Sequence, residues 1–152
     1  MPLADALLPE FDQEMKTTRS LLERVPLDKA SWNPHGRSTG MGTLASHITA
    51  LAGFGNMIVK QTELDIAPSG GQQRQVPQYQ TKEELLAAFD ANVKASRAEI
   101  VKAADADLMT PCSLKSGLHT IFTIPRVSVL RTMLMNHMIH HRGQLSVYLR
   151  LQ

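Results

Sequence analysis

The chain has 152 residues, of which 43% are hydrophobic and 20% are charged, a composition that is typical of a globular protein and excludes a disordered one. A chain of this length is expected to form a single domain, residues 1–152, that is large enough to bury a core. The net charge is only +2 and the 16 basic residues are scattered, so no basic block indicates a nucleic-acid partner.

The sequence also predicts a cytoplasmic protein that does not associate with membranes. A lone cysteine, Cys112, excludes an internal disulfide and suits a reducing compartment. The first residues, MPLADALLPEFDQE, lack the basic start of a signal peptide. The longest uncharged run, residues 38–59, has the length of a membrane span, but its four glycines, His47 and several hydroxyl groups make it too polar for one.

Apolar residues at intervals of three and four predict two helices within the first 60 residues. The first covers residues 3–25, and the following residues 26–40 are expected to form an irregular loop in which Trp32 packs over an end of the core. The second helix covers residues 41–60, and its apolar face carries Leu44, His47, Leu51, Phe54 and Ile58. Gly53 and Gly55 each cost about 1 kcal/mol in a helix relative to alanine, a cost that the close approach of another backbone would explain.

Two more helices are expected after a long connection, residues 61–80, which contains two prolines and two glycines. Thr81 and Glu84 form the pattern of a capping box and begin a third helix that runs to about residue 104. The TIFTI run predicts a short extended pair within residues 106–124, and Pro125 opens a last helix that ends near residue 151. The predicted fold is therefore all-α, a four-helix bundle with a long connection between helices two and three and at most a short β-hairpin before helix four.

Three histidines on apolar helix faces indicate a metal site. His137 and His141 are four residues apart, so their rings lie about 6 Å apart along the helix axis and project the same way. His47 occupies a buried-face position on the second helix, where a histidine taken alone is more often a satisfied core residue. Because an unpaired buried polar group costs about 1–3 kcal/mol, three such rings favour a shared divalent ion. Three neutral imidazoles with an open position are typical of catalytic zinc sites.

The sequence around these residues limits the chemistry. No glutamate follows His137, so the metalloprotease pattern H-E-x-x-H is absent. His140 lies about 100° around the helix from His141 and has two interpretations, a surface or interface histidine, which is the commoner case, or an acid–base group or outer support of the site.

The remaining polar candidates are expected to lie outside the site. His35 and His119 fall in predicted loops, where solvated side chains are the rule. Cys112 has no sequence neighbour that would act as its base. Glu14 and Thr18 border the apolar face of the first helix; solvated edge positions are the commoner case for them, and an outer contact to the site is the alternative.

The run NHMIHHRGQL, residues 136–145 on a C-terminal helix, resembles the closing motif of the DinB/YfiT-like family of proposed metalloenzymes. The segment GTLASHITAL, residues 42–51, is similar to the second-helix segment of that family and has His47 at its first ligand position. The helix order and the Trp-x-Pro loop before the second helix also match, so the resemblance covers nearly the whole chain.

This resemblance implies a four-helix bundle, often homodimeric, in which His47, His137 and His141 hold one divalent ion. Imidazole ligands suit zinc, nickel or iron. Members of the family include enzymes that use low-molecular-weight thiols, transferring bacillithiol or isomerising maleylpyruvate with mycothiol.

Three functions are compatible with such a site. The first is a transferase that activates a low-molecular-weight thiol cosubstrate for transfer to an electrophilic small molecule, and the second is a hydrolase that uses metal-bound water. The third is a metal-binding dimer without turnover, a stress or sensor module in which Gly53, Gly55 and Gly143 serve contacts between subunits. Substrate-binding residues are expected from the loops 26–40, 61–80 and 105–124.

Overall fold

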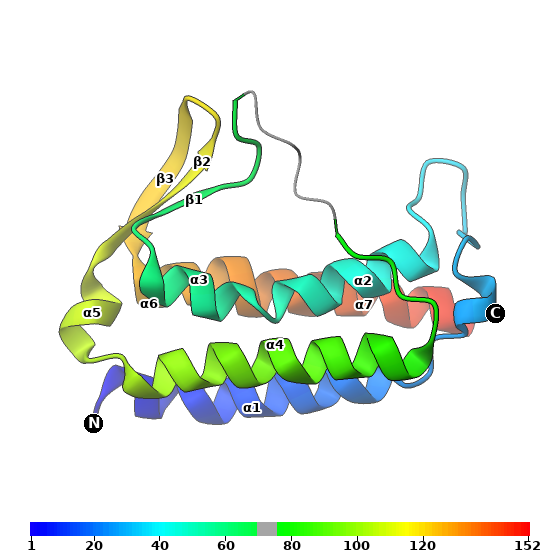
Figure 1. The fold of residues 1–152 in the computed structure, drawn as a ribbon, viewed down its shortest axis with the longest axis horizontal. Helices are drawn as coiled ribbons and strands as arrows, with labels where there is room; N and C mark the ends of the chain where they lie inside the picture. The colour runs from blue at the N-terminus through cyan, green and yellow to red at the C-terminus, as the bar shows by residue number, and fades with distance from the viewer. Residues whose placement is uncertain (70–75) are drawn as a thin grey trace.

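The computed structural model describes residues 1–69 and 76–152, and most of these residues are helical, as predicted (Figure 1). Helix α1 (Leu3–Leu22) lies beside α4 (Lys82–Lys102), and α2 (Met41–Leu51) followed by α3 (Phe54–Lys60) packs against α4. The last helical segment is made of α6 (Arg126–Val129), η2 (Leu130–Asn136) and α7 (His137–Arg150), and its α7 part contacts both α1 and α2. Two short helices, η1 (Leu27–Lys29) and α5 (Asp105–Met109), complete the helical part.

The buried core lies between these helices. Its largest fully buried side chains come from α1, α2, α3, α4, α5 and η2, and they include Phe11, Leu22, Met41, Ile48, Ile58, Phe89, Ile100 and Leu134. Within residues 1–69 and 76–152, no helix combines the length and the apolar character needed to cross a membrane.

The prediction of one continuous helix over residues 41–60 is wrong at its centre, because α2 ends at Leu51 and α3 starts at Phe54. Gly53 and Gly55 lie at this break and face α4 of the same chain. A Cβ on Gly53 would stand 3.2 Å from Oδ1 of Asn92, and a Cβ on Gly55 would stand 2.7 Å from Cβ of Ser96. The two glycines therefore allow close packing within the chain, which accounts for their cost in helix propensity.

Side chains of α4 satisfy backbone groups at the break between α2 and α3. The amide of Asn92 donates a hydrogen bond of 2.9 Å to the carbonyl oxygen of Thr49. The fully buried hydroxyl of Ser96 donates to the carbonyl oxygen of Ala52 at 2.5 Å and accepts from the backbone N–H of Asn56 at 3.2 Å. These bonds pair helix-end groups that would otherwise be buried without partners.

A small sheet stands over the end of the molecule that carries α3 and α6 (Figure 1). The expected extended pair is the hairpin of β2 (Pro111–Ser116) and β3 (His119–Pro125), which turns at Gly117 with a φ of 60°. The prediction of at most a hairpin missed β1 (Glu63–Asp65), which pairs in parallel with β2 so that Leu64 lies opposite Leu114. Three residues are too few for a periodic signal, and their partner strand lies almost fifty residues further along the chain.

The loop before α2 is held against the C-terminal half of α7. Trp32 is partly buried against the core, as predicted, and meets the ring of Tyr148 edge to face with a centroid distance of 5.8 Å. The hydroxyl of Tyr148 donates a hydrogen bond of 3.1 Å to the carbonyl oxygen of Thr39. These two contacts place residues 37–39 close to the histidines of α2 and α7.

Candidate metal centre

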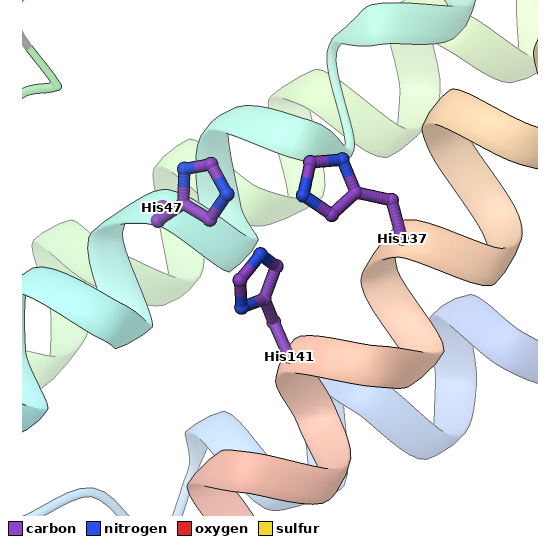
Figure 2. A group of neighbouring side chains, drawn as sticks. All are labelled: His47, His137 and His141. Carbon is purple, nitrogen blue, oxygen red and sulfur yellow. The ribbon is translucent and has the colours of Figure 1, made fainter. Parts of the chain in front are cut away.

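The structure brings His47, His137 and His141 together between α2 and α7. Each ring offers one ligand nitrogen, and these nitrogens lie within 4.8 Å of one another. Figure 2 shows the three rings turned toward a common point, one from α2 and two from successive turns of α7. Small side-chain rotations would reduce these separations to the about 3.4 Å expected between two nitrogens on one tetrahedral zinc ion. The three-histidine group can therefore hold a divalent ion.

Two of the three rings have a hydrogen-bond partner outside the group, and for His141 this partner fixes which nitrogen carries the proton. Nδ1 of His141 lies 2.7 Å from Oε1 of Gln144, so Nδ1 donates and Nε2 keeps its lone pair. The ring of His137 is hydrogen-bonded to the backbone of Met133. Metal-binding histidines usually donate their second ring nitrogen to a carbonyl or amide oxygen in this way, because the contact orients the ring and strengthens it as a ligand.

The segment η2 supplies one of these supports. It is π-helical over Leu130–Asn136, where a uniform α-helix was expected, and it ends directly before His137. Single-turn π segments within helices are frequent at functional sites because they change which groups face inward. Here the segment contains Met133, whose backbone contacts the ring of His137.

The electrostatics of the group favour neutral rings at neutral pH. The pKa of His47 is lowered to about 4, first by burial and then by the charges of His141 and His137. The pKa of His137 is also lowered, first by burial and then by His141 and His140, while the hydrogen bond to Met133 acts in the opposite direction. Both residues therefore keep a free lone pair at pH 7, which a metal ligand requires.

The lowered pKa of His47 predicts acid sensitivity of the metal-free protein. Between pH 6.5 and about 4 the unfolded chain binds a proton at His47 that the folded chain resists, so stability is present above pH 6.5 and falls as the pH drops through this window. The expected loss is on the order of 1–2 kcal/mol after solvent screening at a half-buried ring is discounted. Urea unfolding at pH 7, 5 and 4 measures it. His47→Gln should flatten the pH dependence, and an unchanged slope in that variant would contradict the assignment to His47.

Two pockets of different character border the histidines. The polar pocket has a volume of about 470 Å³, and its lining includes Arg37, Ser38, Thr43, His47, His141 and Gln144. The apolar pocket has a volume of about 330 Å³, and its lining includes His47, Phe54, Met57, Ile66, Met133 and His137. The expectation that substrate-binding residues come from the loops 26–40, 61–80 and 105–124 stays a prediction, but each of these three segments contributes to the linings, the last through Leu114.

His140 is exposed and does not join the three-histidine group. Its Nε2 accepts a hydrogen bond of 3.2 Å from the amide nitrogen of Gln144, and its ring lies 5.0 Å from that of His141, measured between centroids. Gln144 thus bridges His140 and His141 with the two ends of one amide. Gln144 was not among the residues predicted from the sequence, although its place three residues after His141 and four after His140 puts it on the same helix face as both.

The other polar residues considered above lie elsewhere. Glu14 forms an ion pair with Arg142, and the hydroxyl of Thr18 accepts a hydrogen bond from the same guanidinium, so both link α1 to α7 and make no contact with the three histidines. Cys112 is fully buried, and burial raises the pKa of its thiol. His35 and His119 are exposed.

The fold and the site define a mainly helical protein with a three-histidine candidate metal centre. A family model described as the DinB family matches residues 1–152, and the chain belongs to that family. No curated protein is similar enough in sequence to count as a match.

Two solved structures have the same fold. A DinB-like protein from Bacillus cereus ATCC 10987 superposes with a TM-score of 0.70 at 21% identity, over 97% of this chain and 91% of that chain. A DinB-like protein from Bacillus subtilis superposes with a TM-score of 0.66, also at 21% identity, over 92% of this chain and 87% of that chain.

Proposed function

We propose that this chain is a four-helix-bundle, homodimeric transferase that uses a divalent ion to activate a low-molecular-weight thiol for transfer to an electrophilic small molecule. The observation that carries the proposal is the group of three half-buried imidazoles, two of them with an outer partner, at the border of two pockets. A divalent ion bound there, whether zinc, nickel or iron, would lower the pKa of a thiol enough to leave a thiolate near neutral pH.

Each residue of the site has a defined part in this proposal. His47, His137 and His141 hold the ion, while Gln144 and the backbone of Met133 orient two of the rings. In the transfer, the sulfur of the thiol forms a bond to the acceptor carbon as the bond from that carbon to its leaving group breaks, and the thiol proton goes to solvent. His140 is the acid–base candidate for carrying that proton, because its exposed ring is connected to His141 through Gln144.

A thiol suits the described linings better than water as the nucleophile. A hydrolase that also relied on a carboxylate base would have one candidate here, because Asp65 is the only carboxylate among the described residues that line the two pockets. Its Oδ1 already accepts hydrogen bonds of 3.0 Å from the backbone N–H groups of Ala67 and Gly117. A thiol is far more acidic than water and can lose its proton without such a base.

Thiol screening of the metal-loaded protein tests this function. The protein is incubated with low-molecular-weight thiols, including bacillithiol and mycothiol, and an electrophile such as 1-chloro-2,4-dinitrobenzene, and product formation is followed by absorbance. We expect turnover that stops on chelation of the ion and returns when the ion is restored. Hydrolysis of esters or amides without any thiol would instead favour the hydrolase. No turnover by a fully metal-loaded dimer would favour the non-catalytic sensor module.

Homodimer formation is a separate expectation, and the groove between α1 and α7 supports it. This groove is lined by residues that include Leu21, Ile139, Gly143 and Ser146, and a Cβ on Gly143 would meet nothing within 4 Å. Ile139 is 36% exposed there.

Light scattering at micromolar concentration should give about twice 16.8 kDa for the wild type and a single chain mass for Ile139→Arg, because a buried unpaired charge opposes association. Ile121→Arg, on β3, is the matched control, and a monomeric wild type would contradict the expectation.

A further inference from the structure

The three-histidine group lies where the polar pocket and the apolar pocket meet. His47 borders both pockets, His141 borders only the polar one, and His137 borders only the apolar one. The two sides of the candidate metal centre therefore present different surfaces to anything that approaches it.

The polar side carries the positive charge of Arg37, whose side chain is exposed. Arg37 lines this pocket, and its guanidinium has no hydrogen bond or ion pair with the part of the chain that the structure describes. No acidic side chain is among the described residues that line the polar pocket. The loop that carries Arg37 is held in place by the contact between Tyr148 and Thr39. An arginine presented in this way suits a carboxylate, which it can bind through two parallel N–H bonds.

The other side is mainly apolar, and Asp65 is the one carboxylate among its described residues. Phe54 and Met57 come from α3, Ile66 follows β1, and Met133 comes from η2. The one carboxylate, Asp65, is engaged by two backbone N–H groups. A volume of about 330 Å³ is at the small end of the range for ligand pockets, about 300–1,000 Å³, and fits an aromatic ring or a short alkyl chain.

We propose that two reactants of opposite polarity meet at this centre, an anionic one whose carboxylate is bound by Arg37 and an uncharged apolar one bound between α3, β1 and η2. This inference rests on the proposed transferase function and adds the chemical class of both reactants. It assigns the carboxylate to the polar side, where the exposed guanidinium of Arg37 attracts it, and the acceptor to the side where burial of apolar surface stabilises it.

Binding of small imidazoles to the cobalt(II)-loaded protein tests the inference without turnover and without a thiol. Imidazoles bind divalent cobalt through a ring nitrogen, so binding is followed by the visible absorption of the ion. Three probes share this anchor. 4-Methylimidazole is the reference, imidazole-4-acetate adds a carboxylate, and 4-phenylimidazole adds an apolar ring. The affinity of each substituted probe is expressed relative to the reference for each protein variant.

Two variants should separate the two sides. Arg37→Gln is expected to reduce the relative affinity for imidazole-4-acetate about fivefold and to leave that for 4-phenylimidazole unchanged. Ile66→Asn is expected to do the reverse, with a loss of about fivefold for 4-phenylimidazole only. Ile66 is 51% exposed, so this substitution removes apolar surface from the pocket without opening the core.

The matched controls are Arg24→Gln and Ile121→Asn. Arg24 is exposed in the groove between α1 and α7, and Ile121 is 46% exposed on β3, so neither should change either relative affinity. Relative affinities that stay constant in Arg37→Gln or in Ile66→Asn, or that fall equally in the controls, would overturn the inference. Metal content distinguishes failure of the proposed function from failure of this inference. A wild type that takes up no ion would contradict the proposed function itself. Full cobalt occupancy with unchanged relative affinities would contradict only the assignment of the two reactants.

Discussion

Replacing His47, His137 or His141 by alanine is expected to remove most of the metal that the purified protein binds. The three ligand nitrogens lie within 4.8 Å of one another and come from two helices, so any single loss leaves at most two protein ligands. We expect affinity to fall by at least about 100-fold, more than the 10- to 100-fold typical when only an outer partner of a ligand is removed. Metal content by plasma emission spectrometry and competition with a chelator measure the effect.

Other histidines of the chain are the controls for this experiment. His35 and His119 are exposed and outside the group, so His35→Ala and His119→Ala should keep full metal content. Full metal in His47→Ala would show that α2 does not donate a ligand, and the three-histidine site would then be wrong.

Substitution of Gln144, which is a hydrogen-bond partner of one ligand, should cause a smaller loss of metal affinity than substitution of the ligand itself. Its Oε1 accepts from Nδ1 of His141, and removing that contact frees the ring to rotate and to change tautomer. Gln144→Ala should therefore weaken metal binding by about 10- to 100-fold, less than loss of His141 itself. Gln144→Glu keeps an acceptor oxygen in the same place and should retain most of the affinity.

Gly55→Ala is expected to destabilise the protein by about 1–3 kcal/mol, although alanine favours a helix by about 1 kcal/mol. The new Cβ would stand 2.7 Å from Cβ and 2.9 Å from Oγ of Ser96. Ser96 is fully buried and cannot move aside without disturbing the hydrogen bond from its hydroxyl to the carbonyl of Ala52. The free energy of unfolding in urea measures the loss.

Gly36→Ala is the control for the Gly55 substitution. A Cβ at Gly36 meets nothing within 4 Å, and its backbone does not have the positive φ that favours glycine. Alanine there should stabilise the protein by about 0.4–1 kcal/mol, because it restricts the unfolded chain. If Gly55→Ala were as stable as the wild type, α3 and α4 would not be packed as closely as the structure has them.

The helical elements could be predicted wherever a local signal was strong. The capping box of Thr81 and Glu84 is present at the start of α4, with the Thr81 hydroxyl accepting from the backbone N–H of Glu84 at 3.2 Å. The break at Gly53 could not be predicted in the same way, because it depends on Asn92 and Ser96, which lie about forty residues further along the chain. Helix propensity predicts that both glycines destabilise a helix, but it does not predict which residues they contact.

The candidate site likewise depends partly on local sequence signals and partly on contacts between distant segments. The spacing of His137 and His141 placed both rings on one helix face, and the apolar periodicity of the second helix placed His47 on its buried face, where the family resemblance also has a ligand. The sequence by itself therefore determined the family, the helical class and which three histidines to consider. Only the tertiary structure decided that the three rings meet, that Gln144 and Met133 support two of them, and that Arg37 and Ile66 line two different pockets beside them. The physical reason is that helical periodicity is local and can be seen in a sequence, whereas a contact between α2, β1, η2 and α7 depends on how the whole core packs.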